Sequence, residues 1–258
     1  MNMLEGNTEG RARTLWLGFS PGESRRLLDD VVSRVGIPIH HLLLGVFVHA
    51  YAKRMDVNEL AVEVESHGRV VLDGGMDISR VIGWHTSTYP IHVGRITADL
   101  IDNLAYVSKA LAEVPDLGVA CGEHGLDDHC AIPMPAAGIC YNYLGEINFN
   151  HDERVDWQVS SPPIGRARGD SNDRIHDLKL SARCIQGRLV IDLSFPGKSD
   201  FIAMTAIMQE VKVVLLQLCD GVEAGAHHVA GEQKDVLLHV PNLAPQSCEV
   251  PLAHVDAV

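Results

Sequence analysis

The sequence predicts an α/β fold, because short segments of alternating apolar and polar residues follow one another with apolar helical segments between them. Residues 15–19 alternate in this way and predict a short strand near the N-terminus. Two more strands are expected at 178–185 and 188–195, joined by a hairpin at Gln186–Gly187. Strands early and late in the chain, with helices between them, indicate an α/β layer.

Four helices are expected from capping residues and apolar patterning. Ser20, Pro21 and Glu23 form a helix start in which a capping box satisfies free backbone N–H groups, and this helix runs to about residue 35. Residues 39–54 are apolar on nearly all sides, which predicts a buried helix. The other two helices are expected at 99–113 and 200–219.

Between these helices the chain shows further strand patterns. Residues 60–65 place valines on one face and Glu63 and Glu65 on the other. After an expected turn at 73–75, residues 81–93 predict an irregular piece that leads into a strand, and 138–143 predict another strand.

Composition limits the classes of function. Lys plus Arg number 21 and Asp plus Glu number 34, so the formal charge is 21 − 34 = −13. Such an acidic chain has no overall attraction for nucleic-acid phosphates or anionic membranes. The six cysteines form no CxxC pair, the N-terminus lacks a signal-peptide core, and no apolar run approaches about 20 residues. A cytoplasmic protein without membrane or nucleic-acid partners is therefore expected.

The expected domain organisation has three parts. Residues 1–13 are a polar lead-in, residues 14–220 form one folded unit, and residues 221–258 are a linker-like tail in which Ala, Gly and His are followed by scattered Pro.

Four motifs occur in a fixed order along the chain. They are VEVESHGR (62–69), SRVIGWHTSTYP (79–90), VPDLGVACG (114–122) and CYNYLG (140–145). Together they resemble the C-terminal half, or second lobe, of an epimerization domain of nonribosomal peptide synthetases, in the condensation-domain superfamily. The resemblance covers about residues 13–220. It implies a single lobe like half of chloramphenicol acetyltransferase, with a mixed sheet and helices on one face.

The resemblance also implies a chemistry and a set of site residues. Glu65 is similar to an acid/base residue that acts on the α-proton of an aminoacyl or peptidyl thioester, where a desolvated carboxylate is a stronger base. Asn142 and Tyr143 match groups suited to orienting the thioester or enolate oxygen. The substrate would be carried on the phosphopantetheine of a peptidyl or acyl carrier protein, with no metal or nucleotide cofactor. Strand alternation alone favours a simpler interpretation, in which Glu63, Glu65 and His67 are only the solvated face of a half-buried strand.

Several residues depart from the family pattern or form misleading clusters. The family usually has glycine where this chain has Ser66, glutamate at Val70, phenylalanine at His85 and tyrosine at Cys121. A packed or hydrogen-bonded His85 is favoured over a catalytic one. The segment His40–Gly45 is only superficially similar to the His-His-x-x-x-Asp-Gly active-site motif, because it lacks the aspartate and falls in the expected buried helix.

The cysteines and histidines of residues 121–130 could in principle bind zinc, but their spacing fits no standard zinc module.

The His-His-x-x-x-Asp-Gly motif belongs to the family's first lobe and is absent from this sequence. The isolated chain is therefore expected to be inactive, or an isomerase only when a first lobe complements it. Three alternatives to this epimerization remain open: condensation (amide-bond formation), a non-catalytic lobe that binds a carrier protein or another partner, and a gene relic. Two kinds of partner are expected. A separate protein would supply the first lobe, or an apolar face left exposed around Trp84 and Tyr143 would lead to self-association.

Overall fold

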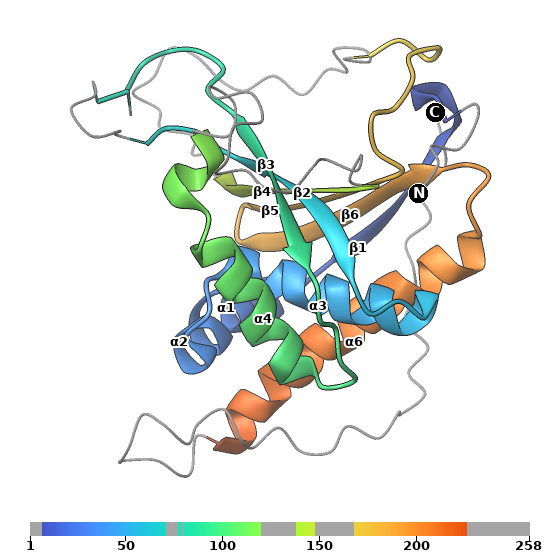
Figure 1. Ribbon diagram of the computed structural model, residues 1–258. Coiled ribbons are helices and arrows are strands. Elements are labelled where there is room, and N and C mark those ends of the chain that lie inside the picture. Colours follow the sequence, from blue (N-terminus) through green and yellow to red (C-terminus); the bar gives the residue numbers. More distant parts are fainter. Residues whose placement is uncertain (1–6, 71–76, 79, 120–137, 148–167, 226–258) are drawn as a thin grey trace.

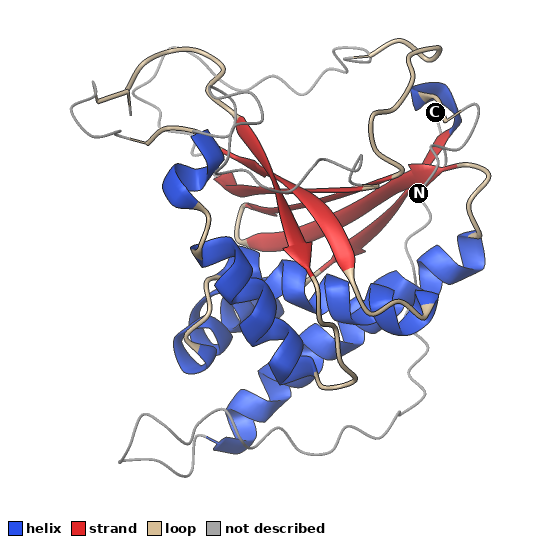
Figure 2. Ribbon diagram, viewed as in Figure 1, coloured by secondary structure: helices blue, strands red, loops and turns tan. Residues whose placement is uncertain are grey.

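The chain forms one mixed β-sheet with helices packed on one of its faces. The computed structural model describes residues 7–70, 77–78, 80–119, 138–147 and 168–225. In these residues six strands form a sheet of order β1-β6-β5-β4-β2-β3, and helices α1, α2, α3, α4 and α6 lie below it (Figures 1 and 2). The predicted α/β lobe with a mixed sheet and helices on one face is confirmed.

The strands pair in both directions. Strand β2 is parallel to β4 and β4 is parallel to β5, whereas the other neighbouring strands are antiparallel. The bounds are β1 (Ala12–Gly18), β2 (Leu60–Ser66), β3 (Ser87–Val93), β4 (Ile139–Ile147), β5 (Leu178–Ile185) and β6 (Arg188–Pro196). All six expected strands are present, and β4 continues beyond the end that its pattern indicated.

The helices also follow the predicted order. Their bounds are η1 (Glu9–Arg11), α1 (Pro21–Arg25), a π-helical segment η2 (Arg26–Val31), α2 (Val32–Val35), α3 (Ile39–Met55), α4 (Leu100–Ala112), η3 (Pro115–Gly118) and α6 (Phe201–Gly225). Elements α1, η2 and α2 together occupy the one helix expected at 21–35. Its capping box is formed as predicted, because Ser20 Oγ accepts from the Glu23 N–H and the Glu23 carboxylate accepts from the Ser20 N–H.

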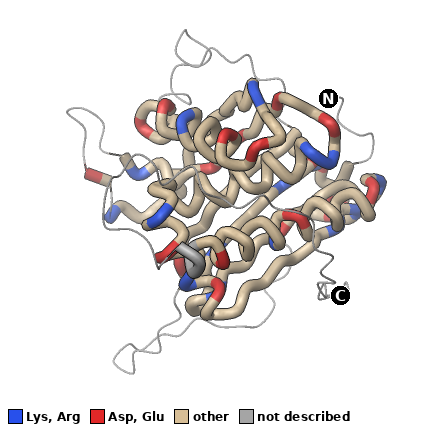
Figure 3. The backbone as a smooth tube through the Cα atoms, turned by 90° about the horizontal axis from the view of Figure 1, so that it is seen from below, with Lys and Arg blue, Asp and Glu red and all other residues tan. Residues whose placement is uncertain are grey.

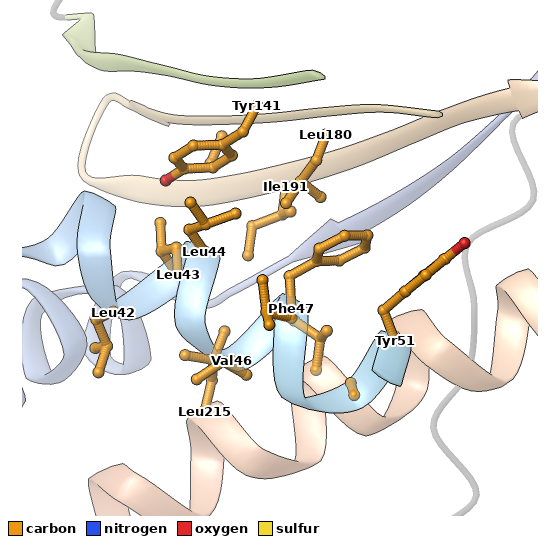
Figure 4. Packing of buried hydrophobic residues seen from close by; sticks show 14 of the residues in the cluster. Leu42, Leu43, Leu44, Val46, Phe47, Tyr51, Tyr141, Leu180, Ile191 and Leu215 are labelled. Atoms are coloured by element: carbon orange, nitrogen blue, oxygen red, sulfur yellow. The ribbon is translucent and has the colours of Figure 1, made fainter. Parts of the chain in front are cut away.

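The hydrophobic core lies between the sheet and α3, which the sequence predicted to be buried. Every residue of α3 from Leu42 to Ala52 is buried, and its large side chains meet Leu180 and Ile191 of the sheet and Leu215 of α6 (Figure 4). This packing explains why α3 is apolar on all sides.

A partly buried hydrogen bond connects the sheet to the start of α3. The hydroxyl of Tyr141, on β4, donates to the main-chain oxygen of His40 at 2.7 Å, and Tyr141 is 1 % exposed. We expect Tyr141→Phe to lower the free energy of unfolding by about 1 kcal/mol, because the ring still packs while the hydrogen bond is lost. Urea unfolding followed by circular dichroism measures this. Tyr106→Phe, at a tyrosine that is 39 % exposed, is the control and should change little; equal effects would contradict the prediction.

Helix α6 corrects one expectation about membranes. An 18-residue window within its stretch Phe201–Gly221 has a mean hydropathy of 1.6, so by length and composition alone this helix could cross a membrane, which the search for uninterrupted apolar runs did not detect. Ile207, Met208 and Leu215 on this helix are buried in the core, and core packing accounts for its apolar character. The segments Pro21–Val35 and Ile39–Met55 pass the same test as a pair but are bent by 91°.

Both expected domain limits fall beside ordered structure. Residues 7–11, in the expected lead-in, bind the segment 169–174: the Glu9 and Gly10 N–H groups donate to the main-chain oxygens of Asn172 and Asp170. Helix α6 continues to Gly225, past the expected start of the tail at residue 221. Residues 1–6 and 226–258 lie outside the described residues.

The surface of the helical layer mixes both charge signs. Seen from the helix side, acidic and basic positions are both scattered over the helical layer (Figure 3). Some of them pair across elements, as Lys53 of α3 does with Glu210 of α6 at 2.7 Å. Such exposed pairs contribute about 1 kcal/mol or less each, so burial of the apolar core dominates stability.

Candidate functional site

The face of the sheet opposite the helices carries a hollow of about 850 Å³. Its floor comes from β2, β5 and β6, and its rim from the segment 168–177, from the residues before β3 and from η1. The charged or aromatic side chains that line it are Glu9, Glu63, Glu65, Trp84, Arg168, Arg174, His176 and Lys179. Charged groups thus gather on the sheet face that no described helix covers.

Glu65, the predicted acid/base residue, lies in this hollow with three donors around its carboxylate. Asn142 Nδ2 donates to Oε2, Lys179 Nζ donates to Oε1 at 3.3 Å, and Cys140 Sγ donates to Oε1 at 3.4 Å. The Glu65 side chain is 21 % exposed. A carboxylate held by three donors has a fixed orientation, which a positioned base requires.

Strand register explains why these four residues meet. In the parallel pairing of β2 with β4, Glu65 stands opposite Asn142 and Glu63 opposite Cys140; on the next strand, Cys140 stands opposite Lys179. Side chains opposite one another in neighbouring strands share a face. The hollow therefore follows from pairing between segments far apart in the chain.

Tyr143 does not join this group. Adjacent strand residues point to opposite faces, so Tyr143 lies on the helix side of β4, where its ring stacks on His40 with 6.1 Å between ring centroids. Burial raises the pKa of its phenol. The structure thus brings Asn142 to Glu65 and places Tyr143 on the other side of the sheet, so the expected apolar face around both Trp84 and Tyr143 is not formed as one surface.

Cys140 contributes a neutral donor to the site. Burial and then the negative charge of Glu65 raise the pKa of its thiol to about 12. The thiol therefore stays protonated at neutral pH and is a poor nucleophile. Cys140 helps to orient the Glu65 carboxylate and is not suited to covalent catalysis.

A second acid–base pair lies beside the first. His176 Nε2 is 3.4 Å from Glu63 Oε2, and each side chain is 14 % exposed. The hydrogen bond from His176 lowers the pKa of Glu63, and burial opposes this shift. At the rim, Arg168 lies 3.4 Å from Glu9 in the same way. Glu63, assigned by alternation to a solvated face, is instead paired inside the hollow.

Arg69 of the VEVESHGR motif holds the loop before β3. Its guanidinium donates to the main-chain oxygens of Ile78, Val81 and Gly83 at 2.9, 2.6 and 3.2 Å. Gly68 lets the main chain of His85 lie close to this strand end. It has φ of +59°, and a Cβ there would lie 1.7 Å from the main-chain oxygen of His85.

The same loop carries Trp84 and His85. Trp84 is 90 % exposed at the edge of the hollow. His85 is half-buried, its Nε2 has no hydrogen-bond partner among the described residues, and it is not among the residues that line the hollow.

Other sequence candidates lie elsewhere. His40 and His41 begin α3 on the helix side, and His41 Nδ1 is 3.0 Å from Ser108 Oγ. Their position in a buried helix agrees with rejecting them as the family's histidine motif. Residues 121–130, the weak zinc candidate, and Cys121 among them lie outside the described residues, as does the turn at 73–75.

Sequence reasoning missed Lys179 and His176. Neither belongs to a motif, and Lys179 is 114 residues from Glu65. The available signal was alternation within β5, where Lys179, Ser181 and Arg183 share the polar face. The alternation shows which face of the sheet Lys179 occupies, but it does not show that Lys179 contacts Glu65.

Comparison with known proteins agrees with the motif resemblance. No family model matches the chain. The chain is 28 % identical over 199 residues to a linear gramicidin synthase of Brevibacillus parabrevis, and 27 % over 194 residues to bacitracin synthase 1 of Bacillus licheniformis. Each alignment covers 74 % of this chain and 4 % of the relative, so the chain spans a small part of these long proteins.

Solved structures show the same fold. The epimerization domain of the third module of tyrocidine synthetase B superposes with a TM-score of 0.74 at 22 % identity, over 86 % of this chain and 51 % of that one. A condensation domain that mediates chain release from the enacyloxin polyketide synthase superposes with a TM-score of 0.56 at 15 % identity. This match covers 93 % of this chain and 44 % of that one. The chain therefore has homologues among nonribosomal peptide synthetases and shares its fold with about half of a solved epimerization domain.

Proposed function

We propose that this chain forms one wall of an epimerization site. The site would invert the α-carbon of an aminoacyl or peptidyl thioester carried on the phosphopantetheine of a carrier protein. The observation that carries the proposal is the Glu65 carboxylate, held in the hollow by Asn142, Cys140 and Lys179. Inversion requires a base that removes a weakly acidic proton from one face of the α-carbon, and an oriented carboxylate is such a base.

The proposal gives the predicted residues different roles. Glu65 takes the α-proton, and Asn142 fixes the carboxylate through its amide. Tyr143, on the helix side, supports β4 through its contact with His40. Among the described residues no helix or strand covers the hollow on the side away from the sheet, where a first lobe would close it and supply the acid/base group for the other face of the substrate.

The test is a stereochemical assay in heavy water. The chain, combined with a first-lobe polypeptide, is incubated with an L-aminoacyl carrier protein, and deuterium at the α-carbon and the D/L ratio are followed by mass spectrometry and chiral chromatography. Deuterium incorporation with inversion is expected. The chain alone should exchange about a thousandfold more slowly, because one member of the acid–base pair is lost.

A matched control uses a carrier loaded with 2-aminoisobutyrate, which has no α-proton and should give no deuterium signal. Amide-bond formation between donor and acceptor thioesters, without inversion, would replace the proposal with condensation. Carrier binding without any reaction would make the chain a non-catalytic binding lobe.

A further inference from the structure

Removing the α-proton of a thioester places negative charge on the carbonyl oxygen. An enzyme stabilises this enolate with donors or a cation aimed at the oxygen, in a site from which water is largely excluded. The phenol of Tyr143 is on the other side of the sheet, and the Asn142 amide is bonded to Glu65. Tyr143 therefore cannot meet the oxygen, and Asn142, whose amide carries two N–H donors, has at most one left for it.

Lys179 has the position and the chemistry that the role needs. Its ammonium is 3.3 Å from Glu65 Oε1, its side chain lines the hollow, and it is 44 % exposed, twice as open as the 21 % of Glu65. A lysine ammonium carries three N–H donors. One contacts Glu65, which leaves two that can bind an oxygen of a substrate in the hollow.

The other basic side chains that line the hollow are held by different groups. Arg174 is 6 % exposed and donates to Ser194 Oγ at 2.8 Å and to the Ser194 main-chain oxygen at 3.2 Å. His176 is bound to Glu63 and Arg168 to Glu9. Among the described residues of the hollow, Lys179 is the cation in contact with the carboxylate that would take the proton.

We propose that Lys179 is a catalytic residue that holds the thioester oxygen while Glu65 removes the α-proton; this rests on the proposed epimerization. The Cα–H bond breaks, its proton goes to Glu65, its electron pair forms the C=C bond, and the carbonyl π pair moves to the oxygen. A proton donor on the opposite face then forms the new Cα–H bond, and the C=O bond is restored. Glu65 afterwards loses its proton to solvent, and the donor regains one.

The contact between Lys179 and Glu65 suits this step electrostatically. Before proton transfer the negative charge is on Glu65, and after transfer it is on the thioester oxygen beside the same ammonium. The charge thus moves from one partner of Lys179 to another without leaving the cation, so the site needs little reorganisation. A lysine that served only to anchor Glu65 would need no substrate contact.

The test compares Lys179→Met, Lys179→Arg and Lys179→Ala in the chain combined with a first lobe. Lys179→Met should lower kcat for α-deuterium exchange roughly a hundredfold with little change in KM. Lys179→Arg, which keeps the charge, should recover part of the loss, and added propylamine should partly rescue Lys179→Ala. The control is Lys53→Met, which removes a lysine from an exposed ion pair on the helical layer and should leave exchange unchanged.

Each result decides one of two questions. Parent-like exchange in Lys179→Met, or an equal loss in the Met and Arg variants without amine rescue, would overturn the role of Lys179. Glu65→Gln, measured in parallel, tests the proposed function separately. Loss of exchange in Glu65→Gln with normal exchange in Lys179→Met would remove only Lys179, whereas normal exchange in Glu65→Gln would remove the proposed site itself.

Discussion

Replacing Glu65 with glutamine should reduce α-proton exchange by about a thousandfold when the chain is combined with a first lobe. Glutamine has nearly the same shape and keeps an oxygen that can accept from Lys179 or Asn142, but its amide cannot take up a proton. The loss should therefore fall on kcat, with carrier binding retained. Mass-spectrometric deuterium uptake and a separate carrier-binding titration measure the two effects.

Glu63→Gln is the matched control for Glu65→Gln. Glu63 is on the same strand and the same face, two residues away, and its partner is His176 rather than Asn142 and Lys179. We expect its exchange rate to stay within a few-fold of the parent. A Glu63 variant as damaged as the Glu65 variant would show that charge in the hollow, and not the Glu65 base, controls the rate.

Replacing Phe47 with alanine should have the largest effect on stability, about 3–5 kcal/mol in the free energy of unfolding. Phe47 is fully buried between the sheet and α6, beside Tyr51 (Figure 4). Its removal costs transfer free energy and leaves a cavity that the sheet and helices cannot fill. Since whole domains are stable by about 5–15 kcal/mol, this is a large fraction.

Urea unfolding followed by circular dichroism measures the change at Phe47. Ile202→Ala is the control, because Ile202 is 74 % exposed on α6 and its loss should change stability by about 0.5 kcal/mol or less. A change below about 1 kcal/mol at Phe47 would mean that the core lies elsewhere.

The elements of the fold were predictable because local patterns decide them. The Ser20–Glu23 capping box, the apolar run of α3 and the alternation in β2 each correspond to a structural feature at the expected place. The π-helical segment Arg26–Val31 was not predictable, because no residue in it marks a change of hydrogen-bond pattern. The extension of β4 to Ile147 depends on pairing with β5, which local sequence does not report.

The site was only partly predictable, because part of it depends on strand pairing that local sequence does not report. Motif resemblance selected Glu65 and Asn142, and the structure places them in contact. The alternation of strand residues was enough to separate Asn142 from Tyr143, since neighbours on a strand face opposite ways. Lys179 and His176 became visible only through strand register and the path of the segment 168–177, which are properties of the folded chain.

The pairing of β1 with β6 has a consequence for how this protein is made. Ala12, near the N-terminus, pairs with Pro196, close to the start of the last helix. A ribosome must therefore release nearly the whole lobe before β1 can find its partner, and contacts this distant in sequence slow folding. Until then Leu15 and Leu17, which the folded lobe buries, remain exposed, and such transient apolar exposure favours aggregation.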